Sequence, residues 1–156
     1  MIKVVAALIE KNNKVLIAKR STWDPNVMGK WELPGGKVEL GEDEFCAIER
    51  EIKEEFELDI KAKEFLINNI CEYPTKTVDL RLYSCDYIVG NFNLHDHSEY
   101  KWVSKDALLN CDLAPADIPL VEYVKKVKKI LLNIMNCLKS KKNLIYQKSK
   151  LNSFLF

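Results

Sequence analysis

The chain has 156 residues, of which 47% are hydrophobic and 30% are charged, and its formal net charge is +1. This length and composition predict one soluble globular domain and exclude an intrinsically disordered chain. Because the net charge is almost zero, no overall field favours nucleic acid or an anionic membrane, so an anionic ligand needs a local site.

The five cysteines are odd in number and include no Cys-x-x-Cys pair. This usage argues against a disulfide framework and against a zinc site. The N-terminal residues lack the features of a signal peptide, and no apolar stretch approaches the ~20 residues of a membrane span. We therefore expect a cytoplasmic protein with no membrane contact and no stable nucleic-acid partner, present as a monomer or a homodimer.

Hydrophobic periodicity predicts a mixture of strands and helices. The first two strands form a hairpin around the polar turn Lys11–Lys14, and loops fill most of residues 21–42. The strands are expected at residues 2–9, 15–20, 64–73, 77–89 and 100–103, and the helices at residues 43–56 and 118–138, with a helical turn at 104–109.

Residues 1–138 are expected to form a single domain, followed by a basic C-terminal tail at residues 139–156. The tail holds five lysines and no acidic residue. A mobile tail is the simplest interpretation. An arm that contacts RNA or another anionic surface is the alternative.

The most informative segment runs from Gly35 to Leu58 and contains a helix with clustered acids. Glu51, Glu54 and Glu55 are spaced i, i+3 and i+4, so they share one face beside an apolar stripe. Such like charges destabilise a helix by about a few tenths of a kcal/mol per pair. Bound Mg²⁺, which prefers carboxylate oxygen and water, would offset this cost. The helix alone leaves open the alternative of a solvated acidic face. The stripe comprises Phe45, Ile48, Ile52 and Phe56.

The loop before this helix favours the metal site. Gly35 and Gly36 allow close backbone approaches, and their carbonyl groups are further hard ligands. Glu42 precedes the helix and can face the same cluster. Arg50 can hold a carboxylate in a fixed, bidentate geometry.

The complete pattern places five residues between Gly36 and Glu42 and seven between Glu42 and the run REIKEEFEL at residues 50–58. It resembles the Nudix signature at every position except one, and the chain is identified as a member of the Nudix hydrolase family. The resemblance implies a loop–helix–loop that binds catalytic Mg²⁺, with Mn²⁺ as a substitute. The implied metal ligands are Gly35, Glu51, Glu54 and Glu55, supported by Glu42 and Arg50.

The exception is Glu57, where the family usually has glycine. Glycine suits the left-handed residue that ends a helix. A glutamate in that conformation would cost about 1–2 kcal/mol, unless the helix ends differently. Because Glu57 is no implied ligand, we do not interpret the exception as a loss of activity.

Outside the signature, the resemblance extends over about residues 2–135. Residues 30–37, KWELPGGK, resemble the MutT group, and residues 113–120, LAPADIPL, resemble a motif of bacterial CTP pyrophosphohydrolases in that group. The resemblance implies an α/β fold of the Nudix type, an α/β/α sandwich around a mixed β-sheet. It also implies that water attacks the β-phosphorus of a nucleoside triphosphate, which gives a nucleoside monophosphate and pyrophosphate.

Several residues outside the acidic helix are candidates for binding the substrate. Lys37 and Arg20 are cations suited to phosphate oxygens, and Arg20 resembles a phosphate-contacting arginine of MutT. An ordinary surface arginine is the alternative. Leu33 is a candidate for the base pocket, together with Tyr73 and Leu82.

Asp96 resembles an acidic residue of MutT relatives that completes the metal site or helps to activate water. Glu99 is its rival, and both can equally be solvated loop acids. His95 and His97 are interpreted as loop residues, because two ligands are too few for zinc. For the general base, Glu51 is the first choice, since water held between it and Mg²⁺ would be partly deprotonated. Asp96 is the other candidate. The catalytic candidates are therefore Arg50, Glu51, Glu54 and Asp96.

Asp117 is the candidate for reading the base. An ionised carboxylate only accepts hydrogen bonds, so it favours a base with an exocyclic amine, such as cytosine or adenine. A protonated carboxyl also donates, which leaves oxidised purines open. The alternative is a cap at the start of the C-terminal helix.

These features predict a pyrophosphohydrolase of CTP, dCTP or a modified or oxidised nucleotide such as 8-oxo-dGTP, with a role in cleaning the nucleotide pool and protecting DNA. A second hypothesis keeps the chemistry but changes the substrate to ADP-ribose, a dinucleoside polyphosphate or capped RNA. A third is a nucleotide sensor without catalysis, which the intact acids Glu51, Glu54 and Glu55 oppose.

Overall fold

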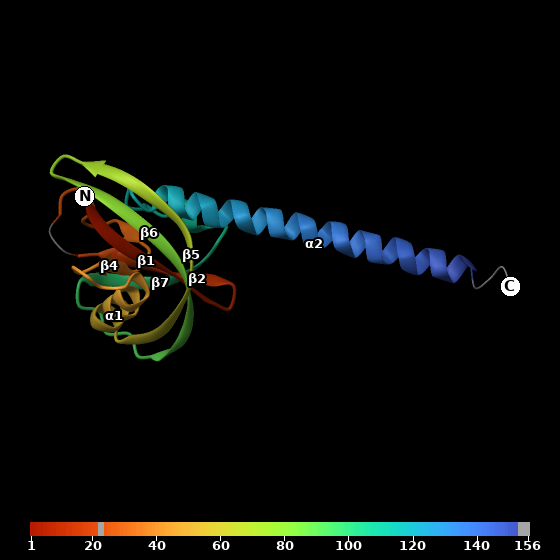
Figure 1. The fold of residues 1–156 in the computed structure, drawn as a ribbon, viewed down its shortest axis with the longest axis horizontal. Helices are drawn as coiled ribbons and strands as arrows, with labels where there is room; N and C mark the ends of the chain where they lie inside the picture. Colours follow the sequence, from red (N-terminus) through yellow and green to blue (C-terminus); the bar gives the residue numbers. More distant parts are fainter. Residues whose placement is uncertain (22–23, 153–156) are drawn as a thin grey trace. The chain divides into compact units, whose positions relative to one another are not determined.

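A computed structural model of the chain describes residues 1–21 and 24–152, with side chains described up to residue 139. Its strands are β1 (Ile2–Lys11), β2 (Lys14–Arg20), β3 (Trp31–Glu32), β4 (Gly35–Lys37), β5 (Leu58–Tyr73), β6 (Lys76–Gly90) and β7 (His97–Ser104) (Figure 1). Within the described residues they form one sheet, with the order β3-β2-β1-β6-β5, while β4 pairs with β1 and β7 with β2. Because β1 and β6 run parallel and the other pairs antiparallel, the predicted mixed sheet is confirmed.

The hairpin of β1 and β2 closes around two asparagines. Lys11 pairs with Lys14, and the two residues between them, Asn12 and Asn13, have φ angles of 51° and 61°. A two-residue hairpin turn needs positive φ at both positions, and asparagine tolerates this conformation better than most residues. The turn sets the register that places Arg20 at the far end of β2.

Helix α1 (Glu44–Phe56) covers one face of the sheet (Figure 1). Its N-terminus is capped by Asp43, whose carboxylate accepts hydrogen bonds from the N–H groups of Phe45 and Cys46 at 2.9 and 3.3 Å. Phe45, predicted on the buried stripe, is instead 38% exposed and lies edge-on to Tyr83. The buried side chains of the helix are Ala47, Ile48, Ile52 and Phe56, which pack against alternate residues of β1 and β2.

The end of α1 confirms the expected strain. Glu57 has φ 57° and ψ 26°, in the left-handed region, and its N–H donates to the carbonyl of Lys53. Its carboxylate accepts a hydrogen bond from Asn93 at 2.8 Å. Glu57 therefore ends the helix in the left-handed conformation that glycine usually adopts, and its side chain is hydrogen-bonded to Asn93.

The opposite face of the sheet is covered by the segment after β7. Ala6, Leu8 and Ile17 are buried but take no part in the cluster around α1, as expected for alternate side chains of a strand. The covering segment includes the 3-10 turn η1 (Leu108–Asn110) and the start of helix α2 (Ile118–Asn152). Its buried apolar side chains include Leu108, Leu113, Leu120 and Val121.

The boundaries that differ from the sequence prediction include those of β5 and β4. β5 begins at Leu58 rather than residue 64, because apolar Leu58, Ile60 and Ala62 alternate with charged residues and turn toward the core. Residues 35–37 were predicted as a loop but form β4. Gly35 makes this pairing possible, since a Cβ there would lie 2.0 Å from the carbonyl oxygen of Val5.

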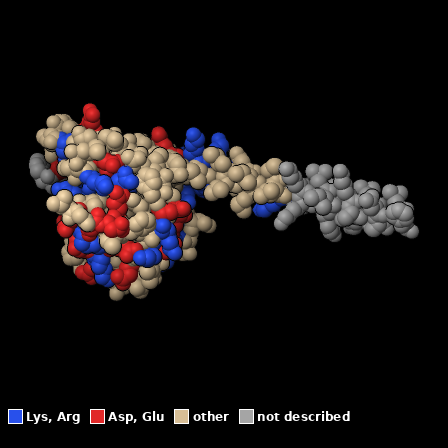
Figure 2. All heavy atoms as spheres, in the orientation of Figure 1, with Lys and Arg blue, Asp and Glu red and all other residues tan. Residues whose placement is uncertain are grey.

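The chain divides into a compact unit, Met1–Tyr123, and a second unit, Val124–Phe156. Helix α2 continues past its predicted end at Leu138, and the side chains of residues 140–156 lie outside the described part of the chain. No described helix is both long and apolar enough to span a membrane. On the visible face of the first unit, acidic and basic side chains are intermixed (Figure 2), which agrees with the absence of a strong overall field.

Candidate active site

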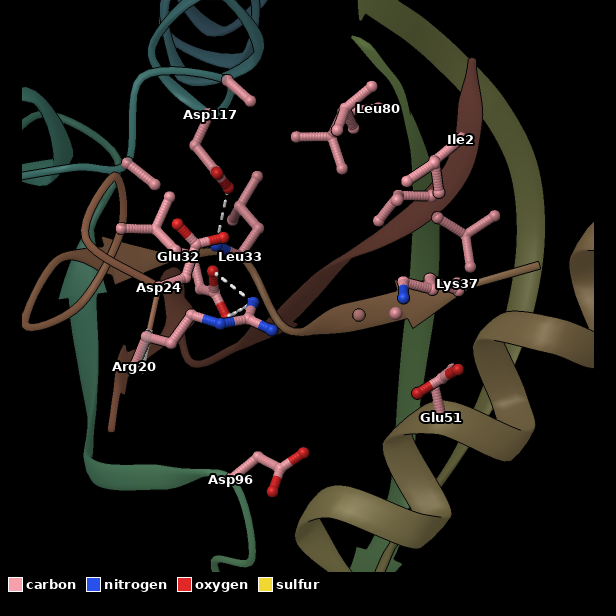
Figure 3. A pocket seen from close by; sticks show the side chains of 18 of the residues that line it. Ile2, Arg20, Asp24, Glu32, Leu33, Lys37, Glu51, Leu80, Asp96 and Asp117 are labelled. Atoms are coloured by element: carbon pink, nitrogen blue, oxygen red, sulfur yellow. Dashed lines mark hydrogen bonds and ion pairs between the residues drawn. The ribbon is translucent and has the colours of Figure 1, made fainter. Parts of the chain in front are cut away.

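A pocket of about 340 Å³ opens between β1, β4, α1 and the segment before α2 (Figure 3). This volume lies within the range of roughly 300–1,000 Å³ typical of small-molecule sites. Eight of the predicted site residues line it: Arg20, Leu33, Gly35, Lys37, Glu51, Glu55, Asp96 and Asp117. Tyr73 also lines it, whereas Leu82 is fully buried in the sheet and does not. Most of the predicted residues, from distant parts of the chain, therefore meet in one cavity, whereas Arg50 and Glu54 do not line it.

Arg50 organises the acids of α1, although it does not line the pocket. Its Nε and Nη2 donate to the two carboxylate oxygens of Glu42 at 2.8 and 2.9 Å, in the expected bidentate geometry. Its Nη1 donates to Glu51 at 2.9 Å and to Glu54 at 3.1 Å. The hydrogen bonds from Arg50 lower the pKa of Glu42 to about 2. Arg50 also donates to the carbonyl of Lys37 at 3.1 Å, which ties β4 to α1.

Glu55 differs from its neighbours because it lacks such a partner. Its side chain is 13% exposed, and the oxygen Oε2 is buried with no hydrogen bond. Burial, together with the charges of Glu51 and Asp96, raises the pKa of Glu55 to about 8. A buried carboxylate without a partner is costly, so a cation at this position would stabilise it.

Gly36 gives Glu51 the space that it occupies. A Cβ at Gly36 would lie 2.1 Å from the carboxylate carbon of Glu51. Because Gly36 has no side chain, it leaves a space at the wall of the pocket that this carboxylate occupies. We call this space the cradle.

These residues fit a hard divalent cation, which prefers carboxylate and carbonyl oxygens. The unpartnered oxygen of Glu55 and the cradle at Gly36 are the observations that support the fit. Among the described side chains, no three acids, histidines or cysteines already converge on one point. Arg50 draws Glu51 and Glu54 toward itself, and Glu54 is 61% exposed, so binding would require these carboxylates to turn.

At the other end of the pocket, two acids are buried beside each other. Asp117 is 4% exposed and Glu32 is 8% exposed. The carboxylate of Asp117 accepts a hydrogen bond from the N–H of Leu33 at 2.8 Å. Burial and the charge of Glu32 raise the pKa of Asp117 well above its usual range. Among the described residues, the bond of this side chain runs to Leu33 and not to the first turn of α2, as a capping role would require.

Glu32 is a pocket residue that the sequence analysis missed. It accepts hydrogen bonds from Nη1 of Arg20 at 2.9 and 3.0 Å, and its Oε1 lies 2.8 Å from Nε2 of His97. An acid inside the otherwise apolar run around Trp31 and Leu33 was the available signal. Arg20, predicted to contact phosphate, thus lies in the pocket with a carboxylate partner.

The loop acids and histidines are also placed. Asp96 lines the pocket, whereas Glu99 lies on β7 and pairs with Lys19 at 3.0 Å. The interpretation of His97 as a loop residue is wrong: it begins β7 and is only 5% exposed. The pairing of β7 with β2 places His97 opposite Arg20 and turns the ring into the interior. His95 remains in the loop before β7, with its side chain half exposed.

The comparisons with known proteins agree with this geometry. The family model described as NUDIX domain matches residues 1–124. CTP pyrophosphohydrolase of Escherichia coli is 36% identical over 122 residues, which cover 78% of this chain and 90% of the relative. A putative 8-oxo-dGTP diphosphatase of Mycobacterium tuberculosis is 38% identical over 117 residues, covering 73% and 81%.

Solved structures show the same fold. The E. coli ORF135 protein is 34% identical and superposes with a TM-score of 0.73, covering 82% of this chain and 91% of that one. The MutT protein from Methanosarcina mazei is 28% identical, with a TM-score of 0.72 and coverage of 82% and 93%. Sequence, fold and the arrangement of acids on α1 lead to the same assignment: the chain belongs to the Nudix hydrolase family.

Proposed function

We propose that this Nudix hydrolase cleaves a nucleoside triphosphate between its α- and β-phosphorus, with Mg²⁺ as the natural cofactor and Mn²⁺ as a substitute. The observation that carries the proposal is that the two ends of one pocket have different linings (Figure 3). Acids suited to a cation line one end, and two buried acids suited to a base line the other. Such a pocket matches a ligand with a polyanionic end and a heterocyclic end.

At the acidic end, the proposed metal ligands are the carbonyl of Gly35 and the carboxylates of Glu51, Glu54 and Glu55, with Asp96 completing the site. When bound, Mg²⁺ would neutralise phosphate charge and lower the pKa of water. Before binding, Arg50 holds Glu51 and Glu54 by hydrogen bonds, and both carboxylates would turn to reach the metal. Glu51 is the proposed general base because its carboxylate lies at the wall of the pocket, and Asp96 is the second candidate.

Two cations are proposed to hold the phosphate chain. Lys37 and Arg20 both line the pocket, and Arg20 pairs with Glu32. Both side chains are cations suited to phosphate oxygens.

At the base end, Asp117 is the proposed specificity residue, with Leu33 as an apolar wall. Burial raises the pKa of Asp117, which makes its protonated form more accessible than that of an ordinary aspartate, and this form both donates and accepts hydrogen bonds. It can therefore meet a carbonyl or a ring nitrogen as well as an exocyclic amine. The proposed substrates are CTP, dCTP and oxidised nucleotides such as 8-oxo-dGTP, in line with the names of the two relatives.

We further propose a cytoplasmic role in cleaning the nucleotide pool, performed by a monomer or homodimer without a nucleic-acid partner. The family model ends at residue 124. A domain that reaches residue 138, followed by a basic tail at 139–156, stays a prediction.

The test is to incubate the protein with Mg²⁺ and a panel of canonical and oxidised triphosphates, and to measure pyrophosphate and orthophosphate separately. We expect pyrophosphate and a nucleoside monophosphate. Glu54→Gln should lower kcat by orders of magnitude, whereas Glu64→Gln, at an exposed acid on β5, should not. Orthophosphate as the only product would refute the cleavage site, and turnover of ADP-ribose or capped RNA alone would refute the substrate class.

A further inference from the structure

His97 is the least expected residue near the pocket. Its side chain is 1% exposed, and its ring stacks on Phe56, the last residue of α1, with the ring centroids 4.8 Å apart. The ring thus lies between the end of α1, which carries Glu55, and β3, which carries Glu32. A polar ring in such a position is costly unless its nitrogens find partners.

Each ring nitrogen faces a different acid. Nε2 lies 2.8 Å from Oε1 of Glu32, within hydrogen-bonding distance. The tautomer of His97 that carries its proton on Nε2 donates to this carboxylate oxygen, which accepts. Nδ1 lies 3.7 Å from Oε2 of Glu55, and both of these atoms are buried without a hydrogen bond. One rigid ring therefore separates an acid of the base end from an acid of the metal end.

We propose that His97 is a positioning residue that fixes the carboxylate of Glu32 at the base end of the pocket and confines the carboxylate of Glu55 at the metal end. This inference rests on the proposed function, because it takes the two ends of the pocket as the base and metal sites. His97 touches neither substrate nor metal in this account and acts through the two acids.

The geometry explains why a ring is needed here. Glu32 already accepts hydrogen bonds from Arg20, whose side chain is 34% exposed at the pocket. The contact from His97 comes from a side chain that is almost fully buried, so it orients Glu32 from the protein interior. Stacking on Phe56 fixes the plane of the ring, and with it the positions of both nitrogens.

Three substitutions separate the two contacts from simple packing. His97→Phe keeps a flat ring against Phe56 but removes both nitrogens. The amide nitrogen of glutamine reaches roughly where Nε2 lies, so His97→Gln can keep the contact with Glu32. The amide nitrogen of asparagine lies near the place of Nδ1, so His97→Asn keeps a polar group only on the side of Glu55.

Two measurements report on the two ends of the pocket. The affinity for Mn²⁺, measured by electron paramagnetic resonance without nucleotide, reports on Glu55. The ratio of kcat/KM for CTP and 8-oxo-dGTP reports on Glu32. We expect His97→Phe to weaken Mn²⁺ binding by about tenfold, as for other residues that orient metal ligands. It should also change the selectivity ratio by about tenfold, the effect of one lost hydrogen bond to a charged group. His97→Gln should preserve the ratio better than His97→Asn.

Thermal melting of each variant checks the fold. A folded His97→Phe with the Mn²⁺ affinity and selectivity of the wild type would overturn the proposal and leave His97 as a packing residue. If His97→Phe does not fold, equal selectivity in His97→Gln and His97→Asn, with normal Mn²⁺ affinity in both, would overturn it as well. A wild-type protein that binds Mn²⁺ but cleaves no triphosphate would refute the proposed function instead, and Mn²⁺ affinity would then decide on His97.

Discussion

Replacing Gly36 with alanine should damage the metal site while sparing the fold. A Cβ at this position would lie 2.1 Å from Cδ and Oε2 of Glu51, whereas ordinary contacts begin near 3.4 Å. The carboxylate must therefore retreat by about 1.3 Å, the difference between these two distances. A misplacement of about 1 Å in a reacting group can cost about 100-fold in rate. We expect kcat to fall by about that factor.

The same substitution should cost little stability. Gly36 lies in β4 and is not among the glycines with positive φ, so its backbone accepts alanine. The displaced atoms are the far end of a flexible side chain, which can turn away. We expect the free energy of unfolding to change by less than about 1 kcal/mol, measured by urea denaturation.

Gly41→Ala is the matched control, and it should have the opposite effects: lower stability and an unchanged kcat. Gly41 has φ +81°, and a Cβ there would meet no atom within 4 Å. Alanine should cost about 1–2 kcal/mol of stability through backbone strain and leave kcat unchanged. Normal activity and Mn²⁺ affinity in Gly36→Ala would refute the role of the cradle, and so would equal losses of activity in both variants.

Three further outcomes are expected from urea denaturation, melting and kinetics. Glu57→Gly should raise the free energy of unfolding by about 1 kcal/mol, because it relieves the left-handed strain, and an unchanged value would contradict this. The raised pKa of Glu55 stabilises the metal-free fold while the group is protonated; this contribution is lost as pH rises from 4.5 through about 8. The melting temperature in chelator should fall over that range, and Glu55→Gln should flatten the fall. Asp117→Asn should keep most base discrimination because the amide mimics a protonated acid, whereas Asp117→Leu should lose about tenfold; equal discrimination in both would exclude Asp117 from base reading.

The parts that the sequence predicted well are those with local causes. The acids of α1 follow from helical spacing, the hairpin follows from Asn12-Asn13, and the start of α1 follows from the acids before it. The strained residue at Glu57 was also visible, because the resemblance names the residue that the position prefers. Each of these features depends on residues within a few positions of one another.

The parts that the sequence did not predict depend on how distant strands align. Glu32 and His97 are 65 positions apart. They meet because β2 pairs with β3 on one side and with β7 on the other. No periodicity in the chain encodes that register.

The partner of Asp117 has the same kind of origin. Leu113 forms a β-bridge with Trp31, and this contact places the segment before α2 next to the segment that carries Leu33. The sequence supported two hypotheses for Asp117, a contact with the base and a cap of the C-terminal helix. The hydrogen bond to Leu33 and the burial beside Glu32 decide where the side chain lies.

The most direct test of the central claim is to follow the oxygen of the attacking water. The protein is incubated with Mg²⁺ and CTP in ¹⁸O-labelled water, and the products are analysed by mass spectrometry. Attack on the β-phosphorus predicts one ¹⁸O atom in pyrophosphate and none in the nucleoside monophosphate. Label in the monophosphate, or orthophosphate and a nucleoside diphosphate as products, would contradict the proposed reaction.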